Sequence, residues 1–176
     1  MDLPFLGLMV FLLLLVAGPD QVTVQNAVVP EPLRPPSGQV VLMHLRGKGK
    51  QIYVCEASAA GASAWKFKAP EANLYNIETG DLVGRHYAGP TWESDGSKVV
   101  GKVVATVLSP DANSIPWLLL TMVSRSDTGM FSKVQTIQRL QTKGGVAPAT
   151  GCTTANLKEE TAVPYEAIYS FYGAAH

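Results

Sequence analysis

The densest group of side chains that could do chemistry lies in residues 84–96. His86, Glu93 and Asp95 supply an imidazole and two carboxylates, the groups that serve as general bases, general acids or metal ligands. Their spacing matches no standard metal-binding motif, so we predict no metal site. Two interpretations stay open: an extracellular catalytic site that uses His86 with Glu93 or Asp95, and a structural histidine beside a charged hairpin.

The same segment carries aromatic side chains that could contact a ligand. Trp65, Trp92 and Trp117, with the tyrosines, could form a platform that stacks on sugars. The alternative is that these rings fill the core of a β-protein. The candidate ligand-binding residues are His86, Tyr87, Trp92 and Glu93.

The motifs of common cofactor-dependent and hydrolytic enzymes are missing from the sequence. There is no G-x-G-x-x-G, G-x-S-x-G or H-E-x-x-H, and residues 47–50 have the wrong spacing for a phosphate-binding loop. The 14 Lys and Arg balance the 14 Asp and Glu, so no basic stripe for nucleic acid is present. We therefore predict no cofactor and no nucleic-acid partner, and the motifs argue against an enzyme.

The N-terminal segment predicts export. Residues 3–17 are uncharged and mostly apolar, like the hydrophobic region of a secretory signal peptide, and too short to span a bilayer. We predict a signal peptide over residues 1–27, cleaved between residues 18 and 27, although Asp2 stands where a basic residue is usual. An uncleaved anchor and a buried N-terminal helix are the alternatives. The mature protein would be secreted and would have no stable membrane span.

A Pro-rich segment separates this leader from the domain. Residues 30–38 contain four prolines, which predicts an extended lead-in over residues 28–38. A chain of 176 residues is too short for two domains of ordinary size, so residues 39–176 form a single β-domain.

The two cysteines allow one intramolecular pair, Cys55 with Cys152. Export would take the chain into an oxidising compartment, where a disulfide persists. Two buried free thiols are the alternative. We predict the disulfide, which also argues against Cys55 as a nucleophile.

The domain has the pattern of short apolar runs and turn residues that is typical of a β-fold. Its apolar runs are short, β-branched or aromatic, and bounded by Gly, Pro, Asn or Asp. Turns are predicted at residues 47–49, 79–81, 126–129 and 143–145. The predicted strands are residues 39–46, 51–57, 64–68, 73–76, 82–87, 91–94, 98–108, 117–125, 130–139 and 163–172. The predicted fold class is all-β, a single antiparallel β-sandwich or barrel of about 8–10 strands.

One hairpin can be placed in register. Residues 95–96 (Asp-Gly) predict a two-residue type I′ turn, whose central positions both need a positive φ. The register pairs Glu93 with Lys98 on one face and Trp92 with Val99 on the other. Trp92 should therefore point inward. The same inward face would carry Gly101, Val103, Ala105 and Val107.

Two other strands are unusually apolar. Residues 117–120 (Trp-Leu-Leu-Leu) are apolar on both faces, so this strand should lie in the middle of the structure. Alternate residues from Val163 to Phe171 share an apolar face, so the C-terminal strand should complete the sheet.

Several ordered motifs resemble one known family. They are residues 84–93 (GRHYAGPTWE), 95–101 (DGSKVVG), 115–120 (IPWLLL), 137–139 (IQR), 142–148 (TKGGVAP), 151–152 (GC), 163–165 (VPY) and 169–172 (YSFY). Over roughly residues 37–172 the chain resembles the secreted domain-of-unknown-function family numbered 3455. The resemblance implies export and one compact domain, and it brings no catalytic or binding positions. Similar sequences carry the name malate dehydrogenase. The present sequence does not support that activity, because it contains no nucleotide-binding loop.

These observations favour a binding module. We expect a secreted β-domain that binds a cell-wall glycan, a small apolar ligand or a protein. The alternatives are a structural or stress-related extracellular protein without a ligand, and the extracellular enzyme described above.

Overall fold

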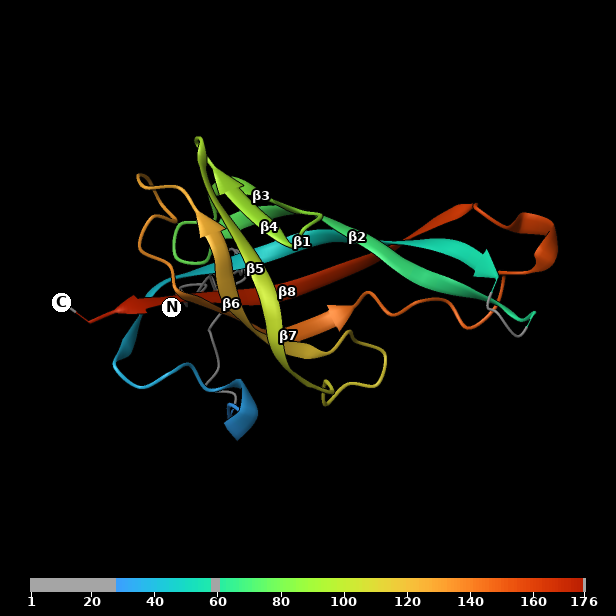
Figure 1. Cartoon of the computed structure of the whole chain (residues 1–176), viewed down its shortest axis with the longest axis horizontal. Coiled ribbons are helices and arrows are strands. Elements are labelled where there is room, and N and C mark those ends of the chain that lie inside the picture. The colour runs from blue at the N-terminus through green and yellow to red at the C-terminus, as the bar shows by residue number, and fades with distance from the viewer. Residues whose placement is uncertain (1–27, 58–60, 176) are drawn as a thin grey trace, which may run out of the picture.

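Eight strands form one antiparallel sheet that closes on itself as a barrel in the computed structural model of the chain (Figure 1). The structure describes residues 28–57 and 61–175, so the predicted signal peptide over residues 1–27 lies outside the described residues. The strands are β1 (Gln39–Ala57), β2 (Ser63–Asn76), β3 (Leu82–Tyr87), β4 (Thr91–Ser94), β5 (Ser97–Val107), β6 (Trp117–Arg125), β7 (Thr136–Gly144) and β8 (Glu160–Ala174). Two 3₁₀ turns, η1 (Glu31–Leu33) and η2 (Thr154–Asn156), complete the described elements. No helix in these ranges is long and apolar enough to cross a membrane.

The strands follow one another around the ring. Each pairs antiparallel with its neighbour in sequence, and β1 pairs with β8 to close the barrel. The predicted all-β antiparallel class is confirmed, and of the two predicted architectures the barrel is the one that forms. Closure pairs the strands that would otherwise be exposed sheet edges.

β1 runs straight through the turn predicted at residues 47–49. A Cβ on Gly47 would lie 2.5 Å from the Tyr169 ring, and one on Gly49 would lie 2.0 Å from the carbonyl oxygen of Glu71. Both glycines therefore serve the close approach of neighbouring strands. The predicted strands 39–46 and 51–57 are one strand for this reason.

The bounds of β2 and β7 also differ from the prediction. β2 joins residues 64–68 and 73–76 through Pro70, close to an irregularity in its pairing with β1, where a proline is tolerated. β7 begins at Thr136 and not at residue 130, because the preceding residues form turns. Phe131 and Val134 of that segment are fully buried in the main core.

β1, β2 and β8 extend beyond the other strands as an arm, seen on the right of Figure 1. They are 19, 14 and 15 residues long, whereas the other strands have between 4 and 11. The disulfide between Cys55 and Cys152 joins β1 of the arm to the connection between β7 and β8, with the Cα atoms 5.3 Å apart. The predicted disulfide is confirmed.

The Pro-rich segment packs on the outside of the barrel. Leu33 is fully buried against Trp117, Leu119 and Leu140, and the Gln138 Nε2 donates to the carbonyl oxygen of Leu33 at 2.6 Å. The extended conformation predicted for residues 28–38 is wrong at η1, which forms a 3₁₀ turn. The burial of Leu33 in the apolar cluster stabilises this turn.

This outer cluster explains why residues 117–120 are apolar on both faces. Alternate residues of β6 face the barrel interior and the cluster beneath η1, as the pattern predicts. The pairing of β5 with β6 shifts register after Val103, which reverses the alternation of the side chains. Ala105 and Val107 consequently pack in the outer cluster, so the prediction that they share the inward face of Trp92 is wrong.

Candidate functional site

The hairpin of β4 and β5 forms in the predicted register. Asp95 has a φ of 43° and the glycine after it has a φ of 77°. The ladder pairs Glu93 with Lys98 and Trp92 with Val99. Trp92 is only 1% exposed, so its predicted inward direction is confirmed.

Glu93 and Tyr87 lie on the outer face of this part of the barrel. The Tyr87 hydroxyl donates to Glu93 Oε2 at 2.5 Å, and Arg85 Nη2 donates to the same oxygen at 3.3 Å. The Lys98 ammonium lies 4.0 Å away. The hydrogen bond from Tyr87 is the main reason that the pKa of Glu93 is lowered, with smaller contributions from Arg85 and Lys98 that act against a partial loss of hydration.

His86 and Trp92 lie on the inner face. Their rings stack with centroids 4.3 Å apart and an interplanar angle of 17°. The Tyr169 ring, which comes from β8, lies 5.2 Å from the His86 ring and 5.5 Å from the Trp92 ring. The three rings form one aromatic group inside the barrel.

His86 is a neutral histidine. It is 3% exposed, and its Nδ1 lies 2.8 Å from the carbonyl oxygen of Thr91, which can only accept, so Nδ1 carries the proton. Burial lowers the pKa of His86 to about 3; the Thr91 contact opposes this shift, and the positive charge of Arg139 adds to it. Near neutral pH the imidazole is an uncharged, weakly basic group.

The structure places the candidate residues on two faces of the sheet and does not bring all of them into one site. His86 and Trp92 face the interior, Tyr87 and Glu93 face the outside, and Asp95 lies exposed at the hairpin turn. The sheet therefore separates the imidazole from the Glu93 carboxylate with which it was considered as a catalytic pair. Within residues 28–57 and 61–175, no group of three or more His, Cys, Asp and Glu side chains could hold a metal ion.

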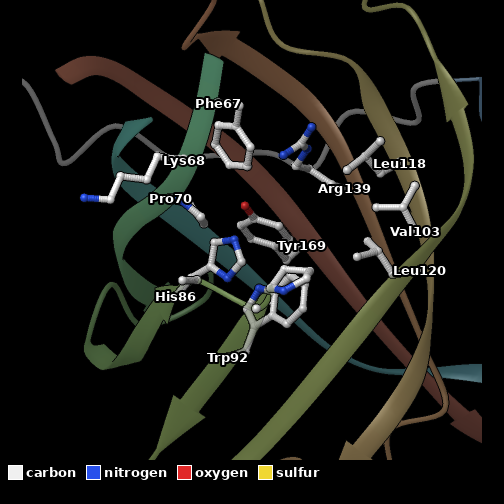
Figure 2. A pocket seen from close by; sticks show the side chains of 13 residues that line it. Phe67, Lys68, Pro70, His86, Trp92, Val103, Leu118, Leu120, Arg139 and Tyr169 are labelled. Atoms are coloured by element: carbon white, nitrogen blue, oxygen red, sulfur yellow. The ribbon is translucent and has the colours of Figure 1, made fainter. Parts of the chain in front are cut away.

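A cavity of about 200 Å³ lies beside His86 and Trp92 (Figure 2). Residues of every strand from β2 to β8 and of the β3–β4 turn line it. The side chains that make its wall mostly apolar are Phe67, Pro70, Pro90, Trp92, Val103, Leu118, Leu120 and Tyr169.

Arg139 brings a positive charge to this cavity. Its Nε and Nη2 both donate to the carbonyl oxygen of Pro116, at 3.2 and 2.8 Å, which fixes the guanidinium. Lys68 also lines the cavity, but its ammonium pairs with Glu160. No carboxylate of the described residues forms an ion pair with Arg139.

Two buried tyrosines lie next to this charge. The hydroxyls of Tyr165 and Tyr169 are 3.2 Å apart. Burial raises the pKa of both phenols, and the nearby Arg139 opposes the shift in each. Both hydroxyls therefore stay protonated, so they are neutral polar groups that do not cancel the charge of the guanidinium.

Sequence reasoning found only part of this site. His86 and Trp92 were named from their local motif, whereas Phe67 and Arg139 were missed because they reach the cavity from β2 and β7. The apolar alternation of β8 was a usable signal for Tyr169, which lies on its inward face. Arg139 had no such signal, since a charged residue in a Thr- and Gln-rich strand is normally exposed.

The fold and the site together define a closed β-barrel domain with a small, partly open and mostly apolar cavity. A family model described as "Protein of unknown function (DUF3455)" matches residues 36–173, and the chain belongs to this family. The resemblance noted from the sequence motifs is thereby confirmed. The comparisons with curated proteins and with solved structures found no match.

Proposed function

We propose that the protein is a secreted binding protein that holds one small, mostly apolar molecule in the barrel cavity. The cavity beside His86 and Trp92 is the observation that carries this proposal. An eight-stranded barrel has an interior that is either filled by side chains or wide enough for one small ligand. At about 200 Å³ the cavity is larger than one known to bind benzene and smaller than a drug-sized pocket.

The tryptophans favour a small ligand in the cavity over a polysaccharide chain on the surface. Trp92 and Trp117 are 1% and 8% exposed, so neither offers a ring face to the surface. Trp65 lies on the arm and donates from Nε1 to the carbonyl oxygen of Thr150 at 2.9 Å. A flat row of exposed rings, which stacking on a glycan requires, is not what these positions supply.

The chemistry of His86 favours binding over catalysis. A histidine with a pKa of about 3 is a weak base near neutral pH, and its considered partner Glu93 faces the other side of the sheet. The apolar segment of residues 3–17 and the Cys55–Cys152 disulfide support secretion.

The proposal is tested by native mass spectrometry of protein recovered from its own secretion medium, followed by titration with 2-naphthoate and its neutral analogue 2-naphthamide. We expect extra mass that is lost on denaturation, and quenching of tryptophan fluorescence by at least one of the two probes. The Val103→Trp variant fills the cavity mouth and should abolish both signals. The control is Val104→Trp, since Val104 is 55% exposed and lies outside the cavity lining.

Two results would contradict the proposal. One is a bare chain that binds neither probe, which would favour a structural role without a ligand. The other is binding that survives Val103→Trp, which would place the ligand elsewhere. The intact mass of the same sample also gives the point of signal cleavage.

A further inference from the structure

The charge distribution inside the cavity carries information about the ligand. Arg139 and Lys68 are the two charged residues of a cavity wall that is otherwise apolar or neutral. The field of Arg139 reaches the interior, since it acts on the pKa values of His86, Tyr165 and Tyr169. A guanidinium stays protonated throughout the ordinary pH range, so this charge is permanent.

The other charged group of the cavity wall is already neutralised. Lys68 forms an ion pair with Glu160, and its side chain is 53% exposed to solvent. Among the described ion pairs none involves Arg139, which donates to the Pro116 carbonyl and interacts with the Tyr169 phenol. A partly buried charge without a counter-charge attracts an anion, because an uncompensated charge in a poorly hydrated site is costly and an anion neutralises it.

Two hydrogen bonds also fix the position of the Arg139 guanidinium in the cavity wall. Nε and Nη2 donate to one carbonyl oxygen, so the side chain cannot swing out of the wall without breaking both hydrogen bonds. The N–H groups on Nη1 are outside that contact. A carboxylate is the anion whose two oxygens match the planar geometry of a guanidinium.

The rest of the wall suits a flat ring. The rings of Phe67, Trp92 and Tyr169 line the space in front of Arg139, with Leu118 and Leu120 beside them (Figure 2). Aromatic walls contact a planar ligand through offset or edge-to-face packing. The volume of about 200 Å³ admits one or two fused rings.

We propose that the ligand of this barrel is a small aromatic carboxylic acid, bound as its carboxylate, with the Arg139 guanidinium as its anchor and the aromatic group as the wall for its ring. This inference rests on the proposed binding function, because it names the class of molecule that the same cavity takes. It assigns the recognition of charge to Arg139, and the recognition of shape to Phe67 and the other apolar side chains that line the cavity.

The test compares two ligands of nearly equal shape, 2-naphthoate and 2-naphthamide, by isothermal titration calorimetry at neutral pH. The wild-type protein should bind the acid about tenfold or more tightly than the amide, as expected for a charge-assisted hydrogen bond. Arg139→Met should remove this preference while the amide still binds. The Lys102→Met control should keep the preference, because Lys102 is exposed and lies outside the cavity lining.

The outcomes separate this inference from the binding function. Equal binding of acid and amide by the wild type would overturn the anion inference and leave the binding function standing. A preference that persists in Arg139→Met would overturn the role of Arg139. Binding of neither probe would count against both proposals. If Arg139→Met does not fold, the wild-type preference for the acid over the amide is measured at increasing salt concentration. A preference that falls with added salt supports an ion-pair anchor, because salt screens the attraction between charges. A preference that does not change with salt would overturn the anion inference.

Discussion

At the scale of single residues, His86 is a buried imidazole whose pKa is lowered by the loss of hydration. It lies under the Trp92 ring with its Nδ1 proton held by the Thr91 carbonyl, and its pKa is about 3. These features make it a structural part of the cavity wall. Protonation of His86 is therefore coupled to unfolding.

The free energy of unfolding should fall as the pH falls from about 6.5 toward 3. Unfolded His86 has the ordinary pKa of 6.5, whereas the folded pKa is about 3, so the unfolded state binds more protons between these values. The slope from this one group is at most about 1.4 kcal/mol per pH unit. His86→Phe keeps a ring against Trp92 and should flatten this dependence, as measured by urea unfolding from pH 7 to pH 4.

His44 provides the comparison, because its pKa is also lowered by burial, although it is only half-buried. His44→Gln should flatten the dependence less than His86→Phe does. Parallel stability curves for the wild type and His86→Phe would show that His86 is not neutral in the folded state.

The sequence predicted the direction of side chains well close to the hairpin turn, but not beyond the register shift that follows Val103. Residues 95–96 placed Trp92 inward and Glu93 outward, and the structure agrees. No local rule could pair Trp92 with Tyr169, or Arg139 with the Pro116 carbonyl, because each of these contacts depends on how distant strands align.

At the scale of elements, the long strand β1 depends on two glycines that look like turn residues in the sequence. The space at Gly49 is occupied by the backbone of β2, and backbone cannot move aside as a side chain can. The sequence pattern therefore predicted the strand residues correctly but divided one strand into two.

Gly49→Ala should destabilise the barrel by about 1–3 kcal/mol, the range for forcing an extra carbon into a packed site. The new Cβ would lie 2.0 Å from the Glu71 carbonyl oxygen, so β1 and β2 must separate. The control is Lys48→Ala, where the lost side chain is 64% exposed and its ion pair with Glu166 contributes little. Urea unfolding measures both, and a Gly49→Ala variant as stable as the wild type would contradict the close approach.

At the scale of the whole molecule, the barrel has a second apolar cluster outside the sheet, which η1 covers. The apolar character of residues 117–120 on both faces indicated this cluster in the sequence. The sequence did not show that η1 covers the outer face of the strand. The same holds for closure: barrel and sandwich share their strand patterns, and only the pairing of β1 with β8 distinguishes them.

Leu33→Ala should lower the free energy of unfolding by about 2–5 kcal/mol, because it leaves a cavity between η1 and the barrel. Leu33 is fully buried, whereas Val28, in the same segment, is 88% exposed. Val28→Ala should therefore leave stability unchanged in the same denaturation experiment. A Leu33→Ala protein with wild-type stability would show that the segment is not part of the folded domain.

The pairing of β1 with β8 has a consequence for synthesis. Gln39 of β1 lies opposite Ala174 of β8, so the ring needs almost the full length of the described chain before it can close. Tyr169 of β8 also forms part of the cavity wall. A ribosome-bound chain that lacks β8 has neither the closed ring nor the complete wall. Contacts between residues so distant in sequence form slowly, which places assembly of the cavity after translation of β8.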